Sequence, residues 1–321
     1  MRCAMPARTT VWCFTLGAAM LLGASIPIAA GRPLRSARSI GPSELDMQVL
    51  LDRAGFSPGE IDGGRGQNSR RALAAFQTAR GLDSGARSRK ALLEALGAGG
   101  VETVTEYTIT DEDAAGPFSE AIPEDMTEKA KLPGLYYTSV VEALGEKFHS
   151  SPALLKRLNP HARFVAGETL RVPNVSPDPL PVHAGTVKVV VSKKTSALTV
   201  YDQKNEVVFH APVTSGSEHD SLPLGRWMVT SVQRHPTFNY NPSLFWDANP
   251  ANAKATIAAG PNNPVGVVWI DINKPHYGIH GTPEPARIGY SESHGCVRLT
   301  NWDALRLADL VRKGTSIVFE E

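Results

Sequence analysis

The stretch "GIHGTPEPARIGYSESHGCVRLTNWDA", residues 278–304, holds the side chains that decide the fold and chemistry of the C-terminal half. A cysteine nucleophile needs a base within reach and backbone donors for the oxyanion that forms on the attacked carbonyl. His280 and His294 are both candidate bases for Cys296. Two histidines and this cysteine within one short stretch predict a cysteine-based active site.

The residues around the cysteine agree with that prediction. Gly295 would let a substrate approach the sulfur without a side chain in the way. Residues 302–314 have the apolar spacing of a helix, and Asn301 is its expected N-cap. Arg298 and the start of that helix would lower the pKa of the thiol and attract a carboxylate.

The composition is that of an ordinary globular protein. The 321 residues suffice for two or three domains. The formal net charge of +1 argues against nucleic acid as the partner, because such proteins usually carry a strongly basic surface.

Residues 1–30 have the pattern of a signal peptide. They carry Arg2 and Arg8 and no acid, followed by an apolar run at 11–28 and two alanines suited to cleavage. An uncleaved membrane anchor is the alternative. Cleavage would leave Cys296 as the only cysteine, which excludes an internal disulfide. The sequence then predicts a soluble exported protein with no stable membrane span.

The apolar periodicity changes along the chain and divides it into segments. Leucines at helical spacing dominate the first part, and short alternating runs rich in Val, Ile and Trp dominate the last. We therefore expect a multidomain chain. The expected boundaries are a flexible lead-in at 31–44, a small three-helix domain at 45–97, a linker at 98–135, an α+β segment at 136–175, a proline-rich hinge at 176–185 and a mostly-β domain at 186–321.

Two N-terminal segments resemble modules that bind the bacterial cell wall. Residues 50–85 resemble the three-helix peptidoglycan-binding module, at Phe56, Pro58, Gly59, Asp62, Gly63, Phe76, Gln77, Gly81 and Leu82. Residues 137–175 resemble a LysM module, although its opening strand is not evident. The resemblance implies wall association, and glycan binding by the LysM-like segment and a purely structural role both stay open.

The C-terminal segment resembles the L,D-transpeptidase (YkuD-type) catalytic domain over about residues 185–321. The signature is His280-Gly281-Thr282 followed by Ser293-His294-Gly295-Cys296-Val297-Arg298. One departure is Leu222, where family members usually have threonine. The resemblance implies a β-sandwich or barrel with one main helix after the catalytic cysteine.

The resemblance also implies a reaction. Cys296 would attack the third residue of a peptidoglycan tetrapeptide stem, release D-Ala and transfer the acyl group to an amine. The amine would belong to another stem, an outer-membrane protein or a lipoprotein, whereas water would give a carboxypeptidase. No cofactor or metal is implied, and carbapenem-type β-lactams are expected to acylate the thiol.

The resemblance assigns roles to individual residues. His280 would be the general base, oriented by the backbone carbonyl of Gly281, and His294 and Gly295 would supply oxyanion donors with Cys296. The expected substrate-binding residues are Arg298, Ser293, Thr282, Trp246 and Tyr290.

The sequence leaves three other interpretations open. A zinc site would take its ligands from His276, His280, His294 and Cys296, but the first two lie in a segment that is not helical. In an NlpC/P60-type peptidase the cysteine precedes its histidine, the reverse of the order here. A non-catalytic wall-binding protein would need only the two N-terminal modules.

Overall fold

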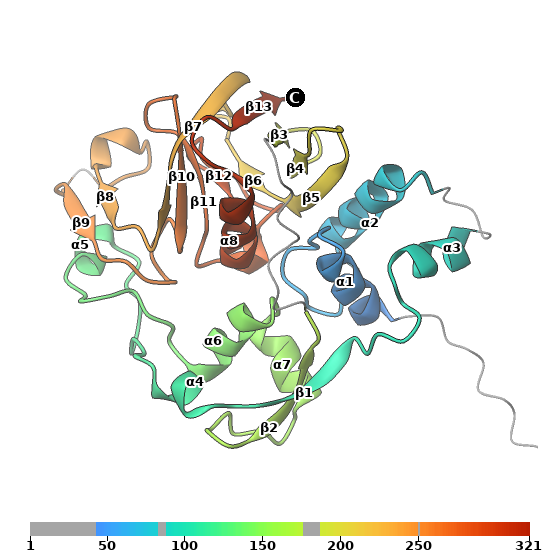
Figure 1. The fold of residues 1–321 in the computed structure, drawn as a ribbon. Helices are drawn as coiled ribbons and strands as arrows, with labels where there is room; N and C mark the ends of the chain where they lie inside the picture. The colour runs from blue at the N-terminus through green and yellow to red at the C-terminus, as the bar shows by residue number, and fades with distance from the viewer. Residues whose placement is uncertain (1–42, 83–87, 176–186, 250) are drawn as a thin grey trace, which may run out of the picture. The chain divides into compact units, whose positions relative to one another are not determined.

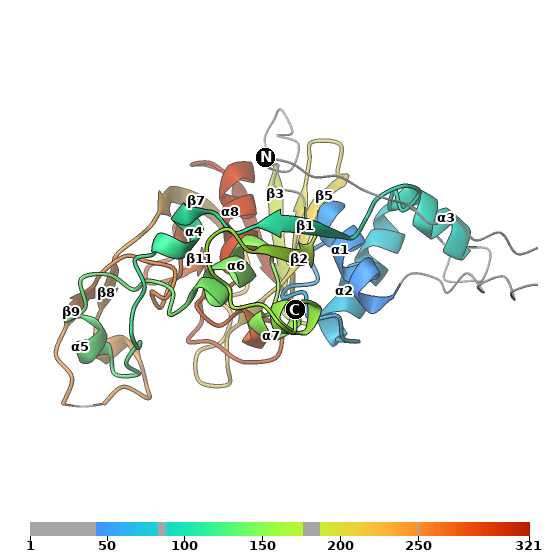
Figure 2. The same ribbon diagram turned by 90° about the horizontal axis from the view of Figure 1, so that it is seen from below.

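The structure is a computed structural model that describes residues 43–82, 88–175, 187–249 and 251–321. The expected signal peptide at 1–30, most of the lead-in and the hinge at 176–185 lie outside the described residues. No helix within the described ranges combines the length and the apolar character needed to cross a membrane. Figures 1 and 2 show the described elements in two views.

A nine-stranded sheet, counted over the described residues, forms the C-terminal domain (Figures 1 and 2). Burial alternates along its strands, as a sheet with one face in the core requires. The order is β5 (Val207–Pro212), β4 (Ala197–Tyr201), β3 (Lys188–Ser192), β13 (Ser316–Glu320), β7 (Gly225–Arg234), β10 (Val268–Ile272), β11 (Gly278–His280), β12 (Val297–Arg298) and β6 (Thr214–Ser215). The strands at its two ends, β5 and β6, are separated in the chain by one residue, so the sheet nearly closes on itself. The expected mostly-β C-terminal domain is confirmed.

Helix α8 (Asn301–Leu310) packs against β10 and β11. Its buried face joins the core of the sheet. Thr300 is its N-cap, because the Thr300 hydroxyl accepts a hydrogen bond from the Asp303 N–H at 3.2 Å. The expectation that Asn301 caps the helix is therefore wrong. The Asn301 amide oxygen instead accepts the N–H of Val267 at 3.1 Å, which ties the start of α8 to the sheet.

The first described segment contains α1 (Glu44–Arg53), α2 (Gln67–Ala79) and α3 (Ser88–Ala95). Ser43 and Asp46 form a capping box at the start of α1. The rings of Phe56 and Phe76 meet edge to face, with centroids 5.1 Å apart. They belong to a core of buried side chains: Leu50, Leu51, Phe56, Ala72, Phe76, Leu92 and Leu96.

The middle segment differs from the expected linker at 98–135. Strand β1 (Val104–Thr108) lies inside that range and pairs antiparallel with β2 (Thr169–Pro173), and α6 (Val140–Lys147) and α7 (Pro152–Leu158) pack beside the pair. Two short helices, α4 (Asp111–Ala115) and α5 (Met126–Lys129), also occur within the expected linker. The partner of β1 lies more than sixty positions later, so this short segment alone did not reveal the pairing.

Backbone pairing joins the N-terminal helices to the sheet. The N–H of Ser57 donates to the carbonyl of His210 at 2.7 Å, and the His210 N–H donates to the Gly55 carbonyl at 2.9 Å. These bonds form a β-bridge between Phe56 and strand β5. The segment that follows α1 therefore adds to the edge of the sheet.

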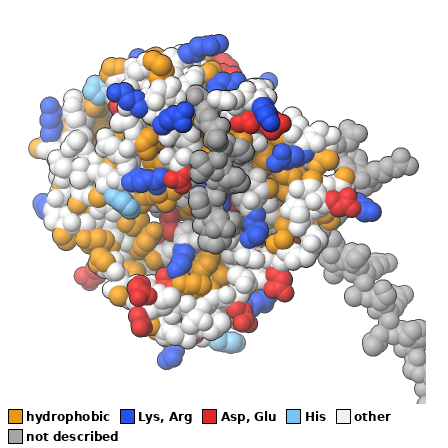
Figure 3. Space-filling model, in the orientation of Figure 1, with side chains coloured by type: hydrophobic (Ala, Val, Ile, Leu, Met, Phe, Trp, Pro, Cys, Tyr) orange, Lys and Arg blue, Asp and Glu red, His pale blue; other side chains and the backbone are white. Residues whose placement is uncertain are grey.

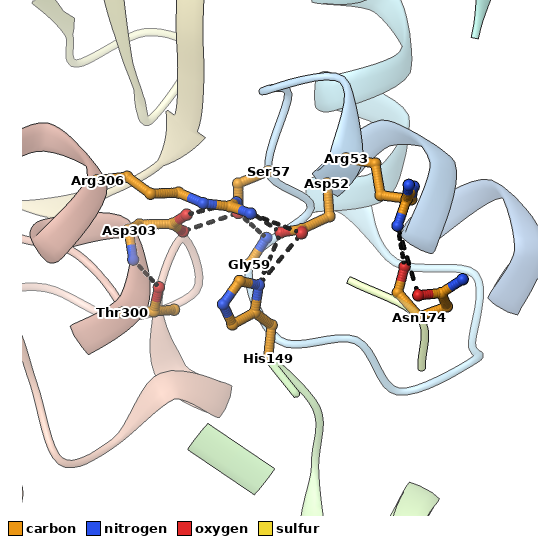
Figure 4. A network of polar contacts seen from close by, with 9 residues as sticks. All are labelled: Asp52, Arg53, Ser57, Gly59, His149, Asn174, Thr300, Asp303 and Arg306. Atoms are coloured by element: carbon orange, nitrogen blue, oxygen red, sulfur yellow. Dashed lines mark hydrogen bonds and ion pairs between the residues drawn. The ribbon is translucent and has the colours of Figure 1, made fainter. Parts of the chain in front are cut away.

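A buried polar network joins all three parts of the described chain (Figure 4). We call its members Asp52, Ser57, His149, Asp303 and Arg306 the seam network. Both guanidinium Nη atoms of Arg306 bind the two oxygens of Asp52, at 2.8 and 2.9 Å. The His149 Nδ1 lies 3.1 Å from one of the same oxygens, and the Ser57 hydroxyl donates to Asp303 at 2.7 Å. Although burial raises the pKa of Asp52, Arg306 and His149 hold it well below its usual range.

The surface carries both signs of charge. On the face drawn in Figure 3, basic and acidic side chains occur together, with hydrophobic side chains between them. The large hydrophobic side chains that are exposed lie in several segments: Val165, Leu224, Met228, Leu244, Trp246 and Tyr290.

Candidate active site

Two short strands bring the ends of the stretch 278–304 together. Strands β11 and β12 are parallel neighbours, with His280 opposite Arg298 in their register. Cys296 immediately precedes β12, so its position along the parallel strand corresponds to Gly278, two residues before His280. Both Cys296 and His280 line the same cleft. The sheet therefore brings the expected nucleophile and base to one site.

The His280 ring is held on two sides. Its Nδ1 lies 2.6 Å from the carbonyl oxygen of Gly281. The indole of Trp269 stacks on the ring, with centroids 5.4 Å apart and planes inclined by 21°. His280 is only 4% exposed. These contacts fix the imidazole, and the Gly281 carbonyl has the position that the sequence predicted for it.

The pKa values of the two groups move in opposite directions. Burial, together with the charge of Arg298, lowers the pKa of His280 to about 3, against the hydrogen bond to Gly281. Burial raises the pKa of the Cys296 thiol, although a backbone hydrogen bond from Gly278 and the charge of Arg298 act the other way. The resting pair is therefore a neutral imidazole and a neutral thiol.

Hydrogen bonds within the loop fix the backbone before Cys296. The Ser293 hydroxyl donates to the carbonyl of Cys296 at 2.6 Å and accepts the N–H of Gly216 at 2.7 Å. Gly295 has φ +92°, and a Cβ there would lie 2.6 Å from the ring of Tyr277. Only glycine fits this position, so the turn and the Tyr277 ring together shape the loop.

The cleft has a volume of about 950 Å³. Of the expected site residues, Cys296, His280, His294 and Arg298 line it. Two buried polar atoms at the cleft have no hydrogen-bond partner among the described residues: the Arg298 Nε and the Asp220 Oδ2. This buried donor and this buried acceptor are therefore available to a ligand that enters the cleft.

The side chain of His294 is paired with a carboxylate. Its Nε2 lies 2.8 Å from a carboxylate oxygen of Asp247, and its ring packs edge to face on Phe245 at 5.1 Å. Trp246 does not line the cleft; it is 59% exposed and packs on His219 with centroids 4.3 Å apart. Both histidines thus line the cleft, His280 held by the Gly281 carbonyl and His294 by the Asp247 carboxylate.

Three further expected substrate residues also lie off the cleft. The Tyr290 hydroxyl is 3.2 Å from the N–H of Gln67, at the start of α2. Thr282 is buried, and its hydroxyl accepts the N–H of Glu284 at 3.2 Å. Ser293 is buried within the loop described above. Tyr290 joins the N-terminal helices to the sheet, and the other two stabilise turns.

Several residues of the cleft were not predicted from the sequence. Trp269 and Tyr277 hold His280 and Gly295, and Asp220 supplies the unpartnered oxygen. Glu124, Asp125 and Met126 line the cleft from within the expected linker. The local sequence around Trp269, Tyr277 and Asp220 gives no sign of their positions at the site. Glu124 and Asp125 form an acidic pair that is visible in the sequence, but such a pair does not point to a cleft.

The zinc interpretation depended on a cluster of ligands. Among the described residues, no group of three or more His, Cys, Asp or Glu side chains is arranged so that it could hold a metal ion. The His276 carbonyl instead faces the Cys296 sulfur, with the two atoms 3.7 Å apart.

Comparison with known proteins agrees with this geometry. A family model described as the L,D-transpeptidase catalytic domain (YkuD) matches residues 186–319. YkuD of Bacillus subtilis (strain 168), named as an L,D-transpeptidase, is 30% identical over 181 residues, 55% of this chain and 91% of that protein. YqjB of the same organism is 30% identical over 45% of this chain and 75% of its own length. YbiS of Escherichia coli (strain K12) is 32% identical over 48% of this chain and 50% of its own. The chain therefore belongs to the L,D-transpeptidase family, and residues 186–319 are its catalytic domain.

Proposed function

We propose that the chain is an exported cell-wall L,D-transpeptidase in which Cys296 is the nucleophile and His280 the general base. The observation that carries the proposal is the parallel pairing of β11 and β12, which brings both residues to one cleft while the Gly281 carbonyl holds the imidazole. The donor is the tetrapeptide stem of peptidoglycan.

The hydrogen bond to Gly281 assigns the tautomer of His280. A carbonyl oxygen only accepts, so Nδ1 of the neutral ring carries the proton. The lone pair then lies on Nε2, which leaves that nitrogen to take the thiol proton. The low pKa of His280 keeps the ring neutral through the whole physiological range.

Acylation follows from a neutral pair. As Sγ of Cys296 attacks the donor carbonyl, its proton passes to Nε2 of His280, and the carbonyl oxygen becomes an oxyanion. The tetrahedral intermediate collapses with cleavage of the C–N bond, and D-Ala leaves with the proton from Nε2. A thioester on Cys296 remains.

Backbone donors stabilise the oxyanion in this proposal. The N–H of Ser293 is already bound to the Gly216 carbonyl at 3.0 Å, which leaves the N–H groups of His294, Gly295 and Cys296 as the proposed donors. Arg298, whose Nε has no partner among the described residues, holds a carboxylate or carbonyl of the donor stem.

An amine completes the transfer. Its nitrogen attacks the thioester carbonyl, the C–S bond breaks and the sulfur regains a proton by way of His280. An amine of a second stem gives a 3→3 cross-link, a lipoprotein or outer-membrane protein amine attaches that protein to the wall, and water gives a tripeptide. We further propose that the helices at 45–97 and the LysM-like segment hold the enzyme on peptidoglycan, and that residues 1–30 direct export.

The test uses mature protein and purified disaccharide-tetrapeptide. Mass analysis should show an acyl-enzyme that retains the donor minus D-Ala, and a dimer that has lost one D-Ala. Cys296→Ala should form neither product and should melt at the wild-type temperature. Cross-linking by Cys296→Ala, or no acylation of the wild type, would exclude this function.

A further inference from the structure

The cleft has a wall that does not come from the catalytic domain. Glu124, Asp125 and Met126 line it together with Cys296, yet they lie sixty or more residues before the start of the family match at 186. We call residues 119–135 the cleft wall. In the chain, this segment is inserted between β1 and α6 of the middle part.

Backbone bonds and packing fix the cleft wall to the catalytic domain. The N–H of Leu135 donates to the Ala259 carbonyl at 3.1 Å, and the N–H of Asn262 donates to the Leu135 carbonyl at 2.9 Å. Leu135 is fully buried in a small core with Tyr240 and Ile257. The end of the cleft wall thus moves with the domain that carries the nucleophile.

A side-chain contact fixes the part that faces the cleft. The amide of Asn252, itself a cleft residue, donates to the second oxygen of Asp125 at 3.1 Å. The first oxygen of Asp125 caps helix α5 through the N–H groups of Thr127 and Glu128. Asp125 is therefore a structural residue, anchored on both sides.

Glu124 differs from its neighbour. It is exposed, and it has no hydrogen bond or ion pair among the described residues. Burial lowers the pKa of Lys129, a basic residue of the cleft wall, while the charges of Glu284, Glu124 and Asp125 act the other way, so Glu124 shares this cation with two other carboxylates.

Acidic side chains outnumber lysine and arginine side chains along the cleft. Four carboxylates line it, Glu124, Asp125, Asp220 and Asp247, whereas Arg298 is the only lysine or arginine among its lining residues. An acceptor amine reaches the cleft as an ammonium ion, which carboxylates attract, whereas the donor stem brings carboxylates of its own.

We propose that the cleft wall is part of the catalytic unit and that Glu124 selects the acceptor, favouring amines on cationic molecules over amines that carry a neighbouring carboxylate. The inference rests on the proposed function. Glu124 would act on binding of the acceptor and not on formation of the thioester.

The test compares two acceptors in the transfer half of the reaction. They are a lysine dipeptide amide, which is cationic, and the same dipeptide with a free C-terminal carboxylate. The variants are Glu124→Gln, Glu124→Asp, which keeps the charge, and Asn252→Ala, which releases Asp125. Glu128→Gln, four residues later in helix α5 and outside the cleft, is the matched control.

Glu124→Gln should raise KM for the cationic acceptor about two- to fivefold, as expected for one partly exposed charge. Salt at about 1 M should abolish the difference, because its screening length is about 3 Å. The rate of donor hydrolysis should not change, Glu124→Asp should restore KM, and Asn252→Ala should raise KM for both acceptors.

Unchanged KM in Glu124→Gln, or an equal change in Glu128→Gln, would overturn the inference while acyl-enzyme formation still supports the proposed function. Failure of the wild type to acylate would instead overturn the function itself. An effect of Glu124→Gln that persists at high salt would assign the residue a structural role.

Discussion

Two arginines eight residues apart in the chain have opposite surroundings. Arg306, in the seam network, binds Asp52 through both Nη atoms, whereas the Nε of Arg298, in the cleft, has no partner among the described residues. Burial lowers the pKa of Arg298, while in Arg306 the Asp52 carboxylate outweighs burial and raises it. The first arginine joins parts of the fold, whereas the second leaves a donor free in the cleft, where we propose that it binds the donor stem.

The largest expected effect tests the cleft. His280→Gln keeps a side chain of similar reach but removes the base, so acylation should slow by about 10²–10⁴-fold. The melting temperature should fall by only a few degrees, since the lost contacts are one hydrogen bond, to Gly281, and one ring stack, on Trp269. Stopped-flow mass analysis of acyl-enzyme measures the rate, and a loss of less than tenfold would contradict the base role.

Substitutions in the seam network should lower the stability of the protein and leave the rate of acylation little changed. Asp52→Ala leaves buried Arg306 with only the longer contact to Asp303, at 3.9 Å, which should lower the free energy of unfolding by about 3–5 kcal/mol. Acylation by the protein that remains folded should be little changed. The double variant Asp52→Leu with Arg306→Met removes both charges and should be more stable than Asp52→Ala. Urea unfolding gives the free energies, and equal losses in the two variants would contradict the ion-pair account.

Glu146, a half-buried acid with no cation partner among the described residues, extends the comparison to pH. Burial raises the pKa of Glu146 to about 8 from 4.5, and its side chain only meets the amide of Asn301, at 3.4 Å. The native protein therefore keeps a proton that the unfolded chain releases above about pH 4.5. Its contribution is full below that pH and is lost as the pH rises through about 8.

Glu146→Gln removes this titration. Between pH 5 and 8.5 the melting temperature of the wild type should fall by about 2–4 °C more than that of the variant, which corresponds to about 1 kcal/mol. Scanning calorimetry at several pH values measures the slopes. Parallel slopes would show that Glu146 is already ionised in the folded protein.

The smallest effect concerns Tyr290, which lies near Cys296 in the sequence but off the cleft. Tyr290→Phe removes the acceptor for the N–H of Gln67 and should cost about 0.5–1 kcal/mol. KM for donor and acceptor should not change. A raised KM would restore Tyr290 to the substrate site.

These contrasts show which parts of the site a sequence can reveal. Cys296, His280 and the Gly281 carbonyl lie within one short stretch with the chemistry of a nucleophile and its base, and the structure brings them together. Tyr290 and Ser293 lie in the same stretch, but closeness in the chain does not tell which way a side chain points. Glu124 lies 172 residues before Cys296, and only the folded chain brings it to the cleft.

The same limit applies to the fold. Alternation of apolar residues predicted the strands of the C-terminal domain, because each buries one face. It did not predict their order, in which β13 lies parallel to β3, and it missed β1, whose partner β2 follows four helices later in the chain. Local patterns determine that a segment is a strand, whereas its neighbours depend on the whole chain.

The β-bridge at Phe56 has a consequence for the solubility of the chain. Strand β5 ends the sheet, and an uncovered edge offers N–H and C=O groups to which a strand of a second molecule can add. By pairing with His210, the residues between α1 and α2 occupy part of that edge with the protein's own backbone. The N-terminal segment therefore protects this edge of the catalytic domain from pairing with a second molecule. A fragment that begins at residue 186 would lose this protection.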